Sequence, residues 1–184
     1  MDDGLFKINR KSHIELGEIY FWTATIHKWI HLLKPDEMKD LIIGSLEHLS
    51  NEGKIDVFGF VIMPNHIHLI WRLNALNGKE MPHSSLLKFT AHHFRKRLEK
   101  TQSLAPFYVD ATNKKYEFWQ RDSLAVHLYS KKVAFQKLDY LHANPLSERW
   151  NLSTRPEDYT YSSASFYEAG KEEFKFLKDI REEF

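Results

Sequence analysis

Two histidines separated by a single residue, His66 and His68, stand in the apolar stretch GFVIMPNHIHLIW, directly after a Pro-Asn turn signal. The stretch favours β structure, and in a strand alternate side chains share one face, with a rise of about 3.3 Å per residue. The two imidazoles would therefore project from the same side of a sheet and could converge on one ion. Two ligands do not complete a metal site, however, and such a pair is equally typical of a polar strand face or of hydrogen-bonded core histidines.

A second pair of candidate groups lies about seventy residues further along, in YLHANPLSERW. Tyr140 and Asn144 are four residues apart, so a helix places them on the same face. Asn144 offers an amide oxygen to a metal, and Tyr140 offers a phenol beside it. By residue type alone, Tyr140 also fits an aromatic residue at the edge of the core, and Asn144 before Pro145 fits a helix end.

The segments that must position these groups alternate between strand and helix patterns. We expect, in order, a strand at 18–27, a helix from Pro35 to Gly53, a hairpin of strands at 55–63 and 66–73, a helix at 84–101, an irregular connection, short extended segments at 116–122 and 124–129, and a helix at 130–143. The order predicts an α+β, ferredoxin-like domain in which helices cover an antiparallel sheet. The chain after Trp150 is expected to wrap the surface and to end in a weakly helical segment.

The length and composition indicate one domain over 1–184, with a core at about 18–167, a polar N-terminal lead and an acidic C-terminal tail. A chain of 184 residues with 42% hydrophobic residues can bury one core, and nothing in its length requires two. The absence of cysteine excludes disulfides, thiolate metal sites and cysteine nucleophiles. No signal-peptide pattern and no membrane-span pattern is visible, so we expect a cytoplasmic protein.

The distribution of charge is more informative than its total of +1. Residues 83–115 carry seven Lys and Arg against two acidic residues, whereas 157–184 carry eight acidic and four basic residues. The helix at 84–101 is expected to turn Leu86, Leu87, Phe89, Thr90, Phe94 and Leu98 inward and a basic face outward. That face is either simply solvated or binds a phosphate backbone. Its candidate DNA contacts are Lys88, Arg95, Lys96, Arg97 and Lys100.

The blocks VIMPNHIHLIW and YLHANPLSERW, taken together, resemble the two signature blocks of the single-tyrosine HUH transposases, and within them the REP-associated tyrosine transposases of bacteria. FWQRD before the second block and EDYTYSSA after it are similar as well, so the resemblance covers roughly 18–167. HUH stands for histidine, hydrophobic residue, histidine. The resemblance implies a ferredoxin-like domain that nicks and rejoins single-stranded DNA, with palindromic or hairpin repeats as the expected partner and the nucleoid as its place when bound.

The resemblance also implies a role for each candidate residue. His66 and His68 fall at the positions of the metal-binding pair, Asn144 at that of the third ligand, and Tyr140 at that of the nucleophile, which forms a 5′-phosphotyrosine. The implied cofactor is Mg²⁺ or Mn²⁺, although imidazole ligands alone would also suit zinc, nickel or iron. Some relatives exchange the tyrosine helix between subunits and others act as monomers, so the resemblance is compatible with a homodimer or a monomer.

Two other functions fit the same residues. The chain could be a nucleic-acid-binding protein of this fold without chemistry, an interpretation that the intact set of His66, His68, Tyr140 and Asn144 disfavours. It could also be a metal-dependent hydrolase in which Tyr140 only orients the substrate, but no carboxylate base stands near the histidines in the sequence. His142, two residues from Tyr140, is expected on another helix face, while His127 and Gln120 could approach the site if their strands do.

Overall fold

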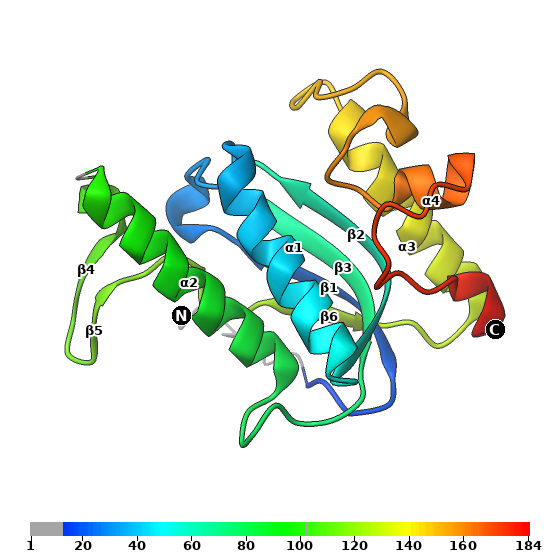
Figure 1. The fold of residues 1–184 in the computed structure, drawn as a ribbon, viewed down its shortest axis with the longest axis horizontal. Coiled ribbons are helices and arrows are strands. Elements are labelled where there is room, and N and C mark those ends of the chain that lie inside the picture. The colour runs from blue at the N-terminus through cyan, green and yellow to red at the C-terminus, as the bar shows by residue number, and fades with distance from the viewer. Residues whose placement is uncertain (1–12, 102) are drawn as a thin grey trace, which may run out of the picture.

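The computed structural model describes residues 13–101 and 103–184. Its centre is a four-stranded antiparallel sheet of β1 (Ile19–Thr25), β2 (Ile55–Met63), β3 (His66–Leu73) and β6 (Leu124–His127), in the order β2-β3-β1-β6 (Figure 1). This order confirms the predicted ferredoxin-like α+β arrangement. The predicted polar lead falls mainly on residues 1–12, which lie outside the described residues.

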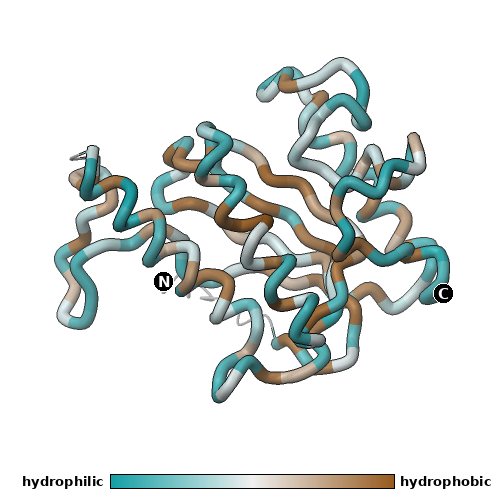
Figure 2. Tube along the Cα trace, viewed as in Figure 1, coloured by the Kyte–Doolittle hydropathy of each residue, from teal (hydrophilic) through white to brown (hydrophobic). Residues whose placement is uncertain are grey.

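Helices cover both faces of the sheet. On one face lie α1 (Asp36–Asn51) and α2 (Pro82–Lys100), whose apolar side chains pack against Trp22, Leu69 and Trp71 of the strands. On the other face lies α3 (Lys131–Ala143), which packs with strand residues such as Phe21 and Ile70. The strands between these layers are the most hydrophobic part of the chain (Figure 2). None of the helices in the described part of the chain is long and apolar enough to cross a bilayer.

The side-chain alternation of β3 separates its two roles. Ile67, Leu69 and Trp71 belong to the core under α1 and α2, whereas Ile70 belongs to the core under α3. His66 and His68 have the same parity as Ile70, so they lie on the α3 face, as strand geometry requires. In the ladder His68 is paired with Thr23 of β1 and with Val61 of β2.

The structure corrects the predictions for the region around α2. Phe89, predicted to face inward, is 44% exposed and packs its ring on His93 instead, because it lies beside the buried helical stripe of Leu86, Thr90, Phe94 and Leu98. The predicted irregular connection contains a small hairpin of β4 (Tyr108–Ala111) and β5 (Lys114–Tyr116). Of the extended segment predicted at 116–122, only its first residue is in a strand, although Trp119 forms an isolated bridge to Ile26.

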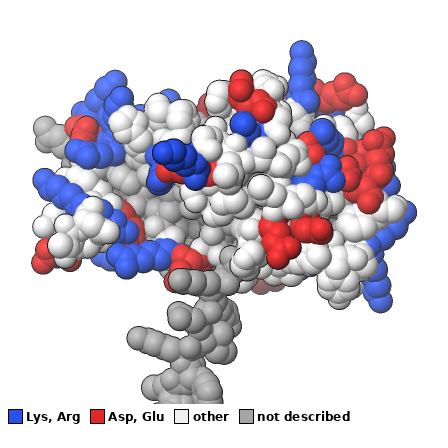
Figure 3. Space-filling view, turned by 90° about the horizontal axis from the view of Figure 1, so that it is seen from below, with Lys and Arg blue, Asp and Glu red and all other residues white. Residues whose placement is uncertain are grey.

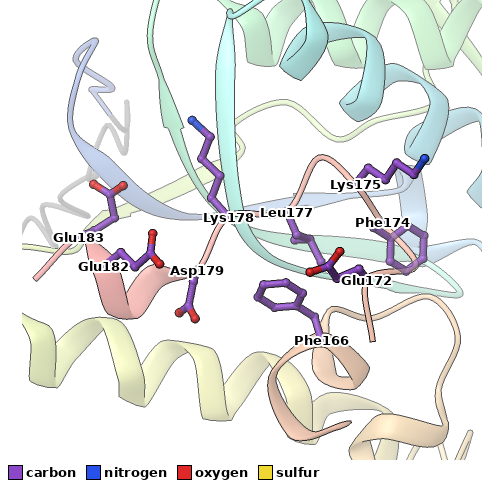
Figure 4. Close-up of a pocket in the computed structure, with 9 residues that line it drawn as sticks. All are labelled: Phe166, Glu172, Phe174, Lys175, Leu177, Lys178, Asp179, Glu182 and Glu183. Carbon is purple, nitrogen blue, oxygen red and sulfur yellow. The ribbon is translucent and has the colours of Figure 1, made fainter. Parts of the chain in front are cut away.

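The C-terminal segment covers the free edge of β2, and the prediction of a weakly helical end is wrong. After the short helix α4 (Ala164–Ala169) the chain is largely irregular, with a single 3-10 turn at Ile180–Glu182. The N–H groups of Ser163 and Lys178 donate to carbonyl groups of β2 at 2.9 Å. Because these contacts satisfy carbonyl groups that an edge strand would leave open, the tail follows the sheet instead of coiling. Figure 4 shows the shallow pocket that this tail and α4 form.

A network of ion pairs fastens the tail to the sheet. Asp56 on β2 is 7% exposed and accepts hydrogen bonds from Arg72 on β3, while the Lys178 ammonium lies 2.6 Å from its second oxygen. Arg72 also reaches Glu183 at 2.6 Å. Burial by itself raises the pKa of Asp56, but the hydrogen bonds from Lys178 and Arg72 outweigh it and lower that pKa.

We predict that Arg72→Met lowers the free energy of unfolding by about 1–3 kcal/mol, because it leaves the buried Asp56 carboxylate with one partner fewer. Arg155, which is paired with Asp158 on the exposed surface, provides the matched control, and Arg155→Met should leave stability unchanged. Urea unfolding of the wild type and both variants measures the difference. Equal effects of the two substitutions would contradict the role given to the Asp56 network.

Candidate active site

His66 and His68 form a buried pair at the start of β3. Their side chains are 8% and 6% exposed, and their ring centroids lie 4.8 Å apart with the rings at 70° to each other. This spacing follows from their positions two residues apart on one face of a strand. Two imidazoles so close together can share one bound ion.

Hydrogen bonds fix how each ring is turned. The Nδ1 atom of His66 lies 2.8 Å from the amide oxygen of Asn65, whose amide nitrogen donates to the Trp29 carbonyl at 3.1 Å. An amide oxygen only accepts, so Nδ1 of His66 carries the hydrogen and the lone pair lies on Nε2. The Nδ1 atom of His68 lies 2.7 Å from the Thr23 hydroxyl, which can hold the second ring in the same tautomer. Outer hydrogen bonds of this kind orient histidine ligands in metal sites.

Both histidines are neutral at physiological pH. Burial lowers the pKa of His66 to about 4, although a hydrogen bond to the Asn144 side chain acts in the opposite direction. Burial, together with smaller contributions from the charges of His66 and Lys137, lowers the pKa of His68 to about 3. The neutral imidazole is the form that binds metal ions, so no proton has to leave before an ion binds near pH 7.

Helix α3 brings Tyr140 and Asn144 to the pair. The Tyr140 ring centroid lies 5.6 Å from that of His68 and 5.9 Å from that of Phe21, and the tyrosine side chain is 52% exposed. Asn144, one helical turn later, hydrogen-bonds to His66. The four residues singled out in the sequence thus lie together, with the phenol open to solvent and the imidazoles buried.

A glycine permits the close approach of α3 to the sheet. A Cβ atom on Gly59 of β2 would lie 3.0 Å from a methyl group of Leu138 and 3.5 Å from the Ser163 hydroxyl. Gly59 also lies at an irregularity in the pairing of β2 with β3. Leu138 lies two residues before Tyr140, so this close approach occurs on the segment of α3 that carries the phenol.

Several groups around the pair were not expected from the sequence. Lys137 places its ammonium 4.9 Å from the Phe21 ring centroid and 5.6 Å from that of Tyr140. On the other side of the pair, Trp150 lies 5.9 Å from His66, ring to ring, and the charge of Arg149 lowers the pKa of His66. Lys137 lies three residues before Tyr140, and that helical spacing is the one signal that could have indicated it.

Other candidates lie away from the pair. The basic helix α2 is on the opposite face of the sheet, with Lys88 paired to Glu80 and Arg95 to Glu99. Its Lys and Arg side chains, with those of β4 and β5, lie toward one end of the molecule, and many acidic side chains lie toward the other (Figure 3). His127 pairs with Glu18 and contacts Tyr20 on the α1 and α2 side.

Gln120 lies beside the histidine strand, whereas His142 has another partner. The backbone N–H of Gln120 donates to the carbonyl of Thr25, and Thr25 is paired with His66 in the sheet. His142 is a buried residue of α3 and, as the sequence suggested, lies on another face of the helix than Tyr140. Its Nε2 atom lies 2.8 Å from the Ser163 hydroxyl.

The donor set fits a divalent ion held partly by water or substrate. Within 13–101 and 103–184, no group of three or more His, Cys, Asp or Glu side chains is arranged to hold a metal. His66 and His68 can supply two nitrogen ligands, and the Asn144 amide next to His66 can supply an oxygen ligand. Three protein ligands leave further positions open, as a catalytic site requires.

Comparison with known proteins identifies the fold. A solved structure described as a REP-associated tyrosine transposase bound to a REP hairpin superposes with a TM-score of 0.59 at 15% identity, over 91% of this chain and 90% of that one. The chain shares the fold of this transposase. A candidate transposase from Deinococcus radiodurans R1 aligns at 17% identity with a TM-score of 0.42, over 76% of this chain and 95% of its own. No protein-family model and no curated protein significantly matches the sequence.

The buried histidines predict a specific response to acid. Burial lowers the pKa of His142 to about 4, from an ordinary value of 6.5. Between these values the unfolded chain binds a proton at this position and the folded chain does not, so stability falls as the pH falls from about 6.5 to about 4. His142→Gln should reduce the slope of unfolding free energy against pH in that window by up to about 1.4 kcal/mol per pH unit.

Urea unfolding of the metal-free protein at several pH values measures this slope. His13, whose side chain is 82% exposed, supplies the control substitution His13→Gln, whose slope is compared with that of His142→Gln. An unaltered slope in His142→Gln would show that this histidine is charged in the folded protein.

Proposed function

We propose that the protein is a metal-dependent transposase that nicks and rejoins single-stranded DNA through a 5′-phosphotyrosine at Tyr140. The observation that carries the proposal is the position of the exposed Tyr140 ring against the buried, neutral pair of His66 and His68. The fold shared with a REP-associated tyrosine transposase supports it independently. An exposed phenol beside two neutral imidazoles is the set of groups that such a reaction needs.

The reaction is an in-line displacement at phosphorus. The Tyr140 oxygen attacks the scissile phosphate, the bond from phosphorus to the 3′-oxygen of the preceding nucleotide breaks, the phenol loses its proton to solvent, and the 3′-oxygen gains one. The tyrosine ester keeps the phosphodiester energy, so attack by another 3′-hydroxyl reverses the step and joins strands without ATP. Lys137 and Arg149, which flank the pair, supply positive charge for the phosphate.

The proposed cofactor is Mg²⁺ or Mn²⁺, held by His66, His68 and Asn144. Such an ion, when bound, polarises the phosphate and offsets the negative charge that develops during the displacement. The chain's own residues prepare the site, because Asn65 and Thr23 hold the two rings in place and burial keeps both rings uncharged.

We propose hairpin-forming single-stranded DNA as the substrate. The structural neighbour is described as bound to a REP hairpin, and this chain aligns with it over most of both lengths. A protein of this fold that binds DNA without cutting it is the alternative, but such a protein would have no need of an exposed tyrosine against a buried histidine pair. A hydrolase that uses water would need a base, and the described residues place no carboxylate in a metal-type cluster with the histidines.

Helix α2 would contact the DNA backbone away from the scissile phosphate, because it lies on the other face of the sheet. We predict that replacing Arg95, Lys96 and Arg97 together with Ala weakens binding to all hairpins and flattens the dependence of log K on log salt, by about 0.7 per lost contact to a single strand. The rate of cutting at saturating DNA should change little. The control replaces Lys171 and Lys175, at the acidic end of the chain, with Ala. An unchanged slope of log K against log salt in the triple variant would place the contacts to the DNA backbone elsewhere.

The central prediction concerns the covalent intermediate. Tyr140→Phe removes only the attacking oxygen, so folding and DNA binding should survive while cutting and adduct formation both disappear. His66→Ala should abolish cutting through loss of the metal, and added Mn²⁺ should restore part of it. Labelled hairpin DNA, incubated with each protein in Mg²⁺ or Mn²⁺ and resolved under denaturing conditions, shows the adduct directly.

Tyr129→Phe serves as the control, since this tyrosine is 73% exposed and its ring contacts His127 on β6. It should cut and form adducts as the wild type does. If Tyr140→Phe also cut normally, the nucleophile would be water and the hydrolase interpretation would replace the transposase.

A further inference from the structure

The side chains of Trp150 and Arg149, in the loop after α3, lie near His66. We infer that Trp150 and Arg149 bind the nucleotide on the 5′ side of the scissile phosphate, the one that leaves with a free 3′-hydroxyl, and that its unpaired base stacks against this pair. The inference rests on the proposed function and names the part of the substrate that this surface holds.

Tyr140 and Trp150 contact different members of the histidine pair. Ring centroids are 5.6 Å apart between Tyr140 and His68, 4.8 Å between His68 and His66, 5.9 Å between His66 and Trp150, and 5.5 Å between Trp150 and His31. Among the described residues no ring contact joins Tyr140 directly to Trp150. The contacts thus form a row that runs from the phenol through His68 and His66 to the indole.

The chemistry of the proposed step assigns a strand to each end of the row. In an in-line displacement the attacking and leaving oxygens lie on opposite sides of the phosphorus. With the phosphate at the histidine pair and the attacking oxygen on Tyr140, the leaving 3′-oxygen points toward Trp150. The sugar and base attached to that oxygen must then lie over Trp150 and its neighbours.

The loop after α3 holds Trp150 in a defined position. The backbone N–H groups of Trp150 and Asn151 both donate to the Ser147 carbonyl at 2.9 Å, and Leu152 donates to the Pro145 carbonyl at 2.9 Å. Asn151 has a left-handed backbone conformation with a φ of 43°, which turns the chain back after the tryptophan. Trp150 is half-buried and packs against the core beneath α3. A fixed ring with one side on the core and part of its surface in solvent is suited to stacking.

Arg149 adds the charge that a nucleotide requires. Its guanidinium lies 5.1 Å from the Trp150 ring centroid, and the side chain is exposed. A guanidinium offers donors to phosphate oxygens and a flat face to a base. Stacking on aromatic side chains is a general way of holding unpaired bases with little sequence preference. The exposed His31 ring borders the same surface.

The test measures adduct formation for each of several protein variants with each of several oligonucleotides. The probe is a library of stem-loop oligonucleotides with randomised single-stranded flanks, from which the wild-type protein selects a cleavable sequence as a covalent adduct in Mn²⁺. Single-turnover adduct formation is then measured with that oligonucleotide and with two versions that carry an abasic site, either directly 5′ or directly 3′ of the cut. The proteins are the wild type, Trp150→Ala, Trp150→Phe and Tyr129→Ala.

We expect the 5′ abasic site to slow the wild type by roughly 5- to 150-fold, the range for loss of one stacked base. With the intact oligonucleotide, Trp150→Ala should form the adduct more slowly than the wild type by a similar factor. The 5′ abasic site should then cause no further loss of rate in this variant. The 3′ abasic site should slow the wild type and Trp150→Ala equally. Trp150→Phe should recover most of the rate, and Tyr129→Ala should behave as the wild type. Because the abasic substrates are also tested on the unaltered protein, instability of one variant does not decide the result.

Independent, multiplicative effects of Trp150→Ala and the 5′ abasic site would overturn the inference and leave the proposed function intact. So would a 5′ abasic site without effect on the wild type. The absence of any adduct with the wild-type protein, or an adduct with Tyr140→Phe, would overturn the proposed function and this inference together.

Discussion

The pairing of β3 between two neighbouring strands is the constraint on which the rest of the structure depends. A strand hydrogen-bonded on both sides cannot shift its register, because a slip of one residue would exchange its two faces. That exchange would put His66 and His68 into the apolar core under α1 and α2 and would expose Ile67, Leu69 and Trp71 to the α3 side. The same ladder therefore supports the hydrophobic core on one face and the candidate site on the other.

The face of the sheet under α3 must exclude water and must also hold polar and charged groups. Apolar residues such as Phe21 and Leu141 exclude water, which makes a charged imidazole costly and keeps both histidines neutral. The rings are oriented by the Asn65 amide and the Thr23 hydroxyl, and the Asn144 side chain also hydrogen-bonds to His66. Positive charge is kept at the rim, on Lys137 and Arg149. Under the proposed function, this arrangement would offer lone pairs to a metal at the base of the site and positive charge to a phosphodiester at its edge.

Local patterns were enough to predict the elements that carry the site. Alternation and the Pro64-Asn65 turn predicted the hairpin of β2 and β3, and helical spacing predicted α3. Once α3 packs on this hairpin, Tyr140 comes close to His68. Asn65 and Thr23 could not be predicted as partners of the rings, because their contacts depend on the turn geometry and on the register of β1 against β3. The course of the tail depends on an unpaired strand edge, which no periodicity within the tail itself reveals. Arg149 and Trp150 stand at the end of the block YLHANPLSERW, but no spacing within that block indicates their proximity to His66.

The missing side chain at Gly59 has a consequence for how the site can change over time. A Cβ atom at this position would lie 3.0 Å from a methyl group of Leu138, closer than most Cβ contacts, so the leucine side chain would have to move. An alanine or a larger residue would therefore press first on Leu138, two residues before Tyr140, without touching any of the four site residues. Under the proposed function, a change at this position can alter the chemistry while every proposed catalytic residue stays in place.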